Sequence, residues 1–224
     1  MNEQLAFTII FAIGFILLLV LNEFIYKRYH INAEYSRKFA HIFASLSSLA
    51  FLATIQSHWY LLFLGALFFL ILYIGKRYHK LKSIDSVQRK TAGSYLLPIA
   101  IYTVFFIAEK SNSELFFILP ILILGISDPL AGIFGTYFRT KTKQIKLAGR
   151  PIDKTILGSW VFFSATLLIS LITLSFFEYP FGKLLAISIT IAFVDTFVEM
   201  VSVRGYDNLT VPLTTILLLF LMGL

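Results

Sequence analysis

Acidic side chains stand at positions of this sequence where an ionised group is costly. Asp128 and Glu199 lie within long apolar runs, and Asp207 immediately precedes another. A carboxylate inside a membrane span costs about 2.5–3.5 kcal/mol on insertion scales and usually marks a functional site. Asp195 and Glu199 are four residues apart, so they share one helix face, where two like charges favour a cation between them. Mg²⁺ prefers hard oxygen ligands, so Asp128, Glu199 and Asp207 are the predicted metal ligands.

The segment around Asp128 combines an acid with small residues and a proline. It reads Gly-Ile-Ser-Asp-Pro-Leu-Ala-Gly-Ile-Phe-Gly over 125–135. Pro129 has no N–H, so we expect the helix to be disrupted there. The glycines leave room for another backbone or for a bulky ligand beside Asp128. The alternative is a small-residue motif for helix–helix contact, which accounts for the glycines but not for the acid.

A second group of polar residues stands where a basic loop meets the apolar run 155–177. Lys154, Thr155 and Ser159 would lie at the start of a helix, with Arg150 shortly before them. Free N–H groups, the positive end of the helix dipole, a lysine and hydroxyls together favour anion binding. The simpler alternative is that Asp153 only caps the helix. The chain has no GxxxxGK[ST] motif, so this is not a Walker P-loop.

A third group leads into the run 39–55. Arg37, His41, Ser45 and Ser48 are spaced by four, four and three residues and would line one helix face. The alternative is a basic collar at lipid headgroups followed by a serine stripe for helix contact. His41, one turn inside the run, is the residue that this alternative explains least.

Composition identifies the kind of protein that must position these groups. The 224 residues are 58% hydrophobic and only 14% charged, whereas soluble domains average about 25% charged. Cysteine is absent, which excludes disulfides, thiolate catalysis and cysteine-ligated metal. We expect one all-α, polytopic membrane domain over 1–224. Its eight predicted spans are 5–25, 39–55, 59–75, 93–108, 115–138, 155–177, 184–203 and 209–224.

The basic residues predict the orientation. Seventeen of the 19 lysines and arginines fall in the loops 26–38, 76–90 and 139–154 or at Arg204. These loops alternate along the chain, so the positive-inside rule places them in the cytoplasm and both termini outside. The first span lacks a basic leader and a cleavage site, and we expect it to be retained. We predict a multi-pass protein of a bacterial inner membrane whose polar groups face the cytoplasm.

Three acids beside a basic cradle are what phosphoryl transfer requires. A metal neutralises the phosphates, cations hold them, and a carboxylate orients or deprotonates the attacking hydroxyl. The nucleotide would arrive from the cytosol. An acceptor reached from within a membrane bundle should be a lipid.

At this point the chain resembles the CTP-dependent lipid kinases, which include dolichol kinase, phytol kinase and CTP-dependent diacylglycerol kinase. This family is related to the phosphatidate cytidylyltransferases. The resembling segments keep the family's order but depart from its pattern at Ser127 and Leu157. They are RKFAHI (37–42), QRKTAGSYLLP (88–98), SDPLAGIFG (127–135), KTILGS (154–159), VDTFVE (194–199) and DNLTVPL (207–213).

The resemblance implies transfer of the γ-phosphate of CTP to the hydroxyl of a membrane lipid alcohol, with Mg²⁺ required. The acceptor would be a phytol- or polyprenol-type isoprenoid alcohol or diacylglycerol. Asp128, Lys154 and Glu199 would be catalytic, and Asp128 is the favoured base. Asp128, Glu199 and Asp207 would hold the metal. The implied nucleotide-binding residues are Arg37, His41, Arg150, Lys154, Thr155, Ser159 and Asn208.

Three other functions remain open from the sequence. A phosphatidate cytidylyltransferase would use the same nucleotide site but make a CDP-lipid. An ion-coupled transporter would use the intramembrane acids as coupling sites, although no internal repeat is visible. A non-catalytic membrane anchor would need none of these acids. We expect the bilayer, CTP and a lipid alcohol as partners and no nucleic acid, while the oligomeric state stays open.

Overall fold

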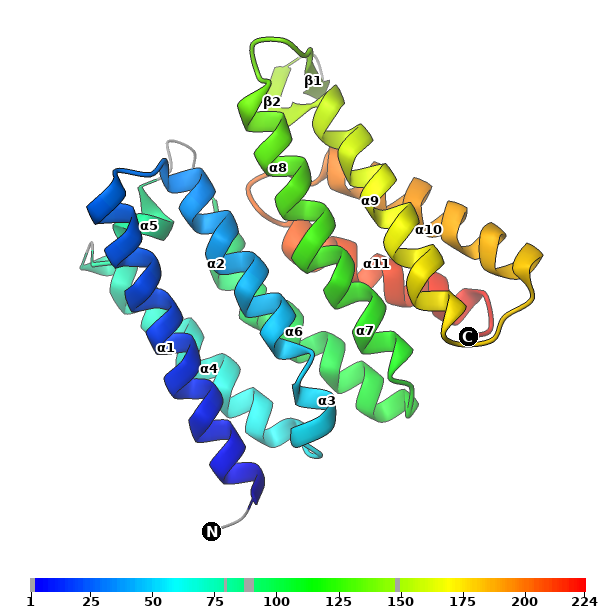
Figure 1. The fold of residues 1–224 in the computed structure, drawn as a ribbon, viewed down its shortest axis with the longest axis horizontal. Coiled ribbons are helices and arrows are strands. Elements are labelled where there is room, and N and C mark those ends of the chain that lie inside the picture. The colour runs from blue at the N-terminus through cyan, green and yellow to red at the C-terminus, as the bar shows by residue number, and fades with distance from the viewer. Residues whose placement is uncertain (1–2, 79, 87–90, 148–149) are drawn as a thin grey trace.

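The computed structural model describes residues 3–78, 80–86, 91–147 and 150–224, most of which are helical (Figure 1). Helical and extended segments follow one another along the chain as a single series. They are α1 (Glu3–Tyr29), α2 (Ala33–Ser48), α3 (Phe51–Thr54), α4 (His58–Arg77), α5 (Lys82–Asp85), α6 (Gly93–Ser111), α7 (Leu115–Leu122), the π-helical turn η1 (Ile123–Ser127), α8 (Asp128–Tyr137), β1 (Gln144–Leu147), β2 (Arg150–Thr155), α9 (Ile156–Ser175), α10 (Phe181–Val201) and α11 (Asp207–Leu221).

Each of the eight predicted apolar runs is largely helical. The run 39–55 is divided between α2 and α3, because the N–H groups of Leu49 and Ala50 turn back to carbonyls only three residues earlier. Within the described residues, five helices are long and apolar enough to cross a membrane: α1, α4, the continuous helix Leu115–Tyr137, α9 and α10. The helix α11 is apolar but shorter. The count of eight spans therefore stays a prediction.

One local departure from an all-helical fold lies in the basic loop 139–154. There β1 and β2 form an antiparallel hairpin with an irregularity between Gln144 and Lys146. The hairpin leads directly into α9, and the N–H of Ile156 bonds to the carbonyl of Lys143 at 3.1 Å. The hairpin therefore fixes where α9 begins.

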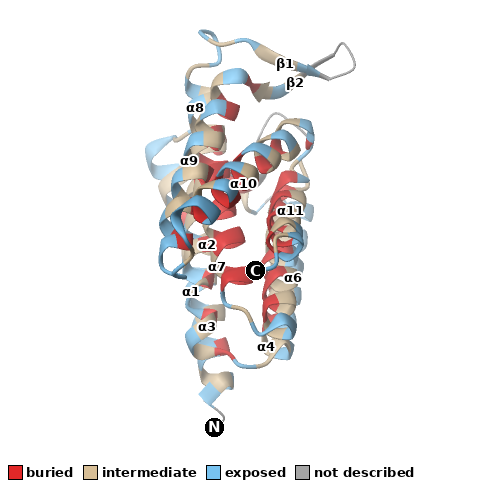
Figure 2. Cartoon of the chain, turned by 90° about the vertical axis from the view of Figure 1, so that its right-hand side faces the viewer, coloured by how far each residue is buried: buried red, intermediate tan, exposed pale blue. Residues whose placement is uncertain are grey.

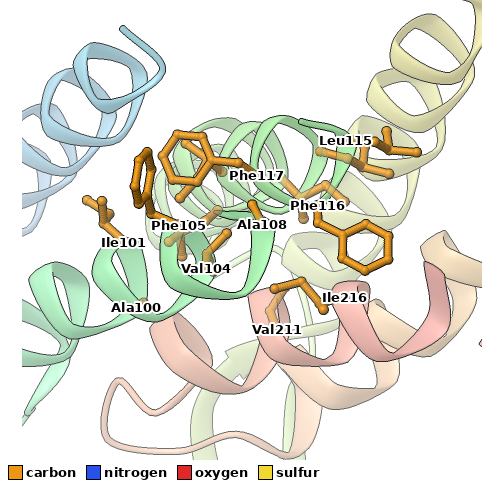
Figure 3. Close-up of a cluster of buried hydrophobic side chains, with 14 of the residues drawn as sticks. Ala100, Ile101, Val104, Phe105, Ala108, Leu115, Phe116, Phe117, Val211 and Ile216 are labelled. Carbon is orange, nitrogen blue, oxygen red and sulfur yellow. The ribbon is translucent and has the colours of Figure 1, made fainter. Parts of the chain in front are cut away.

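The apolar core joins the two halves of the helical bundle. Ala100, Val104 and Ala108 recur every four residues on α6 and are at most 4% exposed. Figure 3 shows this face of α6 directed toward side chains of α7 and α11. Phe105 of α6 meets Phe117 of α7 edge to face, with ring centroids 5.5 Å apart. Small residues on α6 thus allow close helix approach, and the aromatic pair fills the remaining space.

Large apolar side chains also cover the outer surface, as the exposed parts of the helices in Figure 2 show. On α1, Leu17, Val20 and Phe24 are each about 60% exposed. Contiguous apolar surface of this kind is rare on soluble monomers. Together with the five long apolar helices, it is compatible with an integral membrane protein.

The basic segments gather at one end of the bundle. In Figure 1 the α1–α2 turn, α5 and the β-hairpin lie toward the same end, and the N-terminus lies at the opposite end. The short helix α5 packs against both α1 and α2. The candidate site described next lies at this basic end.

Candidate functional site

A polar cavity of about 510 Å³ opens between α2, α8, α9, α10 and α11 at the hairpin end of the bundle. It collects residues that lie up to 170 positions apart in the sequence. Six of the ten predicted site residues line it: Asp128, Lys154, Thr155, Ser159, Glu199 and Asp207. The sequence-based grouping of these six residues is therefore matched by their positions in the fold.

Asp128 is held by a lysine from α2. Lys38 Nζ donates to Asp128 Oδ2 at 2.6 Å and lies 3.3 Å from the Asp128 carbonyl oxygen. The two side chains are only 7% and 5% exposed. Gly132, one turn along α8, makes room for this lysine, because a Cβ there would lie 2.5 Å from Lys38 Cε. The small residue beside Asp128 thus accommodates its counter-ion.

The π-turn η1 explains how His41 is fixed beside this pair. The N–H of Asp128 bonds to the carbonyl of Ile123, five residues back. In the same register the carbonyl of Leu124 would face Pro129, which has no N–H. His41 Nε2 lies 3.0 Å from that carbonyl oxygen. A carbonyl only accepts, so Nε2 must donate, which leaves Nδ1 facing Asp128 Oδ2 at 3.8 Å. The predicted disruption at Pro129 takes the form of this turn.

A second lysine gathers the other two acids. Lys154, near the end of β2, donates to Glu199 Oε1 of α10 and to Asp207 Oδ2 of α11, the latter at 2.6 Å. Burial alone would lower the pKa of Lys154, but the charges of Asp207 and Glu199 outweigh burial and hold its pKa above the ordinary lysine value. Lys154 is therefore a cation at neutral pH.

The start of α9 borders the same cavity. Thr155 is the N-cap of α9, and its Oγ1 accepts from the N–H of Gly158 at 3.1 Å. The alternative cap, Asp153, instead pairs with Arg139 on the surface. The hydroxyl of Ser159 is buried, lines the cavity and has no hydrogen-bond partner in the structure. This unpartnered hydroxyl is available to a ligand in the cavity.

Three predicted nucleotide-binding residues line a different space. Arg37, His41 and Asn208 border an apolar cavity of about 100 Å³ between α1, α2, α4 and α6. Arg37 Nη2 pairs with Glu34 at 2.8 Å, and Asn208 Nδ2 donates to the carbonyl of Gly93 at 2.8 Å. These three residues are therefore not gathered with the six that line the polar cavity.

Two parts of the prediction fall outside the described residues. The side chain of Arg150, the first residue of β2, is one of them. The other is the beginning of the segment 88–98, because residues 87–90 are not described. The remainder of that segment forms the start of α6.

The charges of the polar cavity suit a divalent cation that arrives with phosphates. Acidic side chains outnumber basic ones in its lining, so a triphosphate alone would meet repulsion. Glu199 Oε2 is buried and has no hydrogen-bond partner. In the described part of the chain, no three His, Asp or Glu side chains converge to hold a metal by themselves. Mg²⁺, however, is commonly bound by one or two carboxylates plus substrate phosphates, and Glu199 and Asp207 fit that role.

Lys38 is the functional candidate that sequence reasoning did not assign to the site. It was considered only as part of a basic collar, whereas it is the counter-ion of Asp128. One signal could have found it. A buried carboxylate requires a partner, and Lys38 is a cation at the edge of an apolar run.

Asp195 has a separate environment. Its Oδ2 accepts from the hydroxyl of Thr215 at 2.6 Å, and it is fully buried. It does not line either cavity described above. Its contacts hold α10 to α11.

Comparisons with protein-family models, with curated proteins and with solved structures give no match for this chain. The resemblance to the CTP-dependent lipid kinases therefore rests on the sequence segments alone, and the family assignment stays a prediction.

Proposed function

We propose that this chain is a CTP-dependent lipid kinase that transfers the γ-phosphate of CTP to the hydroxyl of a membrane lipid alcohol. The observation that carries the proposal is the polar cavity, in which Lys38–Asp128 and Lys154–Glu199–Asp207 face one space. Buried acids and lysines of this kind are expensive in an apolar bundle and are not needed by a membrane anchor. Their arrangement suits a triphosphate and its metal.

Each group has a role in the proposed binding of the nucleotide. Lys154 and the Ser159 hydroxyl hold phosphate oxygens at the start of α9. Glu199 and Asp207 face the Mg²⁺ that accompanies CTP, and the bound ion neutralises phosphate charge. The acids and lysines therefore serve to place the γ-phosphorus beside Asp128.

The transfer itself is a substitution at phosphorus. The acceptor's hydroxyl oxygen forms a bond to the γ-phosphorus, and the bond from that phosphorus to the β,γ-bridging oxygen breaks. CDP leaves, and the hydroxyl proton passes to Asp128. Lys38 keeps Asp128 ionised and oriented for this role. The products are a lipid phosphate and CDP.

The basic end of the bundle supports a cytoplasmic position for the site. By the positive-inside rule the loops at this end lie in the cytosol, where CTP is available. Eight spans would then place both termini outside. An isoprenoid alcohol of the phytol or polyprenol type is the first choice of acceptor, and diacylglycerol is the second.

The test uses purified protein in detergent with Mg²⁺ and radiolabelled nucleotide. CTP or ATP labelled at the γ position is offered with phytol, farnesol, a longer polyprenol and diacylglycerol. We expect label to move from CTP to one of these lipids, and we expect Asp128→Asn to abolish transfer while the protein stays folded. Full turnover in Asp128→Asn would remove Asp128 as the base.

Two further arms separate the rival functions. If α-labelled CTP marks phosphatidate and γ-labelled CTP marks no lipid, the protein is a cytidylyltransferase. If CTP does not bind at all, the proposed nucleotide site is wrong and a transporter becomes the better explanation.

A further inference from the structure

The apolar cavity between α1, α2, α4 and α6 has the character of a hydrocarbon site. Its lining includes Phe15 of α1, Leu61 and Leu64 of α4, and Leu97 and Ile101 of α6. A cavity of this chemistry excludes water and takes apolar ligands. Polar side chains border it at one place only among the described lining of α2 and α11, where Arg37, His41 and Asn208 lie.

Neighbouring residues divide between the two cavities. On α2, Arg37 lines the apolar cavity and Lys38 lines the polar one. On α11, Asn208 lines the apolar cavity and Asp207 the polar one. His41, in the apolar lining, lies 3.8 Å from Asp128 Oδ2 in the polar cavity. The two cavities are therefore separated by about one layer of side chains.

Arg37 supplies an independent sign of a ligand. Its residue is only 7% exposed, and its Nη2 is occupied by Glu34. Its Nε is buried and has no hydrogen-bond partner. A buried donor without a partner is costly, so a ligand oxygen at this point would remove the cost.

We propose that the apolar cavity binds the first few carbons of the acceptor alcohol, with the acceptor's hydroxyl at the Arg37 end. This inference rests on the proposed kinase function and adds the place and the chemistry of its lipid subsite. The hydroxyl oxygen accepts from Arg37 Nε and lies next to the wall that carries Asp128. The chain beyond the first carbons lies in the surrounding bilayer.

The size of the cavity determines what the site can distinguish. A cavity of about 150 Å³ lined by Leu, Ile and Phe holds a benzene-sized molecule. At about 100 Å³ this cavity holds only a few carbons. The protein therefore selects its acceptor by the carbons nearest the hydroxyl, and not by total chain length.

Gly65 of α4 gives a way to fill the cavity. It belongs to the lining, and a Cβ there would lie 3.6 Å from the carbonyl oxygen of Pro98 and 3.9 Å from Tyr102 Cβ, which are ordinary contacts. Gly65→Ala should therefore be accommodated, whereas Gly65→Leu should occupy the cavity. Ala66→Leu is the matched control, because Ala66 is exposed on the same helix and does not line the cavity.

The experiment uses a long-chain primary alcohol that carries a diazirine close to its hydroxyl. The full-length protein in detergent is illuminated with this probe, and the labelled peptides are identified by mass spectrometry. We expect label on α4 and α6 peptides that include Leu64, Leu97 or Ile101, and competition by an unlabelled acceptor. Gly65→Leu should abolish this labelling, and Ala66→Leu should retain it.

Kinetics give the second readout. Gly65→Leu should raise KM for the acceptor about tenfold, the scale set by misfit of one or two methylenes, and leave KM for CTP unchanged. Label found only on the outer surface, or labelling that survives Gly65→Leu, would overturn the subsite. Cavity labelling without any transfer from CTP would support the subsite and overturn the kinase function.

Discussion

The ion pair between Lys38 and Asp128 yields the sharpest quantitative prediction. The charged atoms are 2.6 Å apart, and at an effective dielectric constant of about 20 their attraction is about 6 kcal/mol. Removal of the charges from water opposes most of this attraction. Breaking such a buried pair by replacing one partner costs about 3–5 kcal/mol, because the other charge is left alone. We expect Asp128→Asn and Lys38→Met each to lower the free energy of unfolding by that amount, with Asn at the lower end.

The double variant Lys38→Met/Asp128→Leu removes both charges. Replacing a whole buried pair by apolar residues is often neutral or stabilising. We therefore expect the double variant to be nearly as stable as the wild type, so that the two single effects are far from additive. Transfer of phosphate should nevertheless be lost in all three variants, because both charges serve the reaction.

The assay is reversible unfolding in mixed SDS and dodecyl maltoside micelles, followed by tryptophan fluorescence, with transfer activity measured on the same preparations. Single effects that simply add would show that the two charges are not coupled. A double variant that regains activity together with stability would show that the pair is structural only.

Three smaller predictions can be checked with the same assay. Gly132→Ala puts a Cβ 2.5 Å from Lys38 Cε, so we expect a loss of about 1–3 kcal/mol and reduced transfer; unchanged activity would contradict the fit. Thr155→Ala removes the N-cap of α9 and should cost about 1 kcal/mol, most of which Thr155→Ser should restore. Thr215→Val removes the hydrogen bond to Asp195 and should cost about 0.6 kcal/mol, with transfer unaffected; a large loss of activity would assign Asp195 a functional role.

The helices and part of the site could be predicted because strong local signals determine them. Long apolar runs fixed the eight helical segments to within a few residues. The alternation of basic loops required the acids to meet at one end, and Asp128, Glu199 and Asp207 do line one cavity there. The Thr at the junction of loop and helix acts as the N-cap of α9, as its type and position favour.

The division of residues between the two cavities could not be predicted. Arg37 and Lys38 are adjacent and point about 100° apart around α2, so a modest rotation of the helix would exchange their environments. The rotation depends on contact with α8, where Gly132 accepts Lys38. The same holds for Asp207 and Asn208 at the start of α11. The π-turn η1 likewise depends on His41, which lies 83 residues away from the carbonyl that it satisfies.

The central claim is that the polar cavity holds the phosphates of CTP, and binding of Mg²⁺–CTP to the purified protein tests it most directly. Lys154→Met is compared with Lys143→Met, an exposed lysine that precedes the hairpin and does not line the cavity. A charge-assisted hydrogen bond contributes about 1.5–3 kcal/mol, so Lys154→Met should weaken binding by about tenfold or more. Lys143→Met should bind CTP as the wild type does. Equal affinity in both variants, or no binding by the folded wild type, would contradict the account.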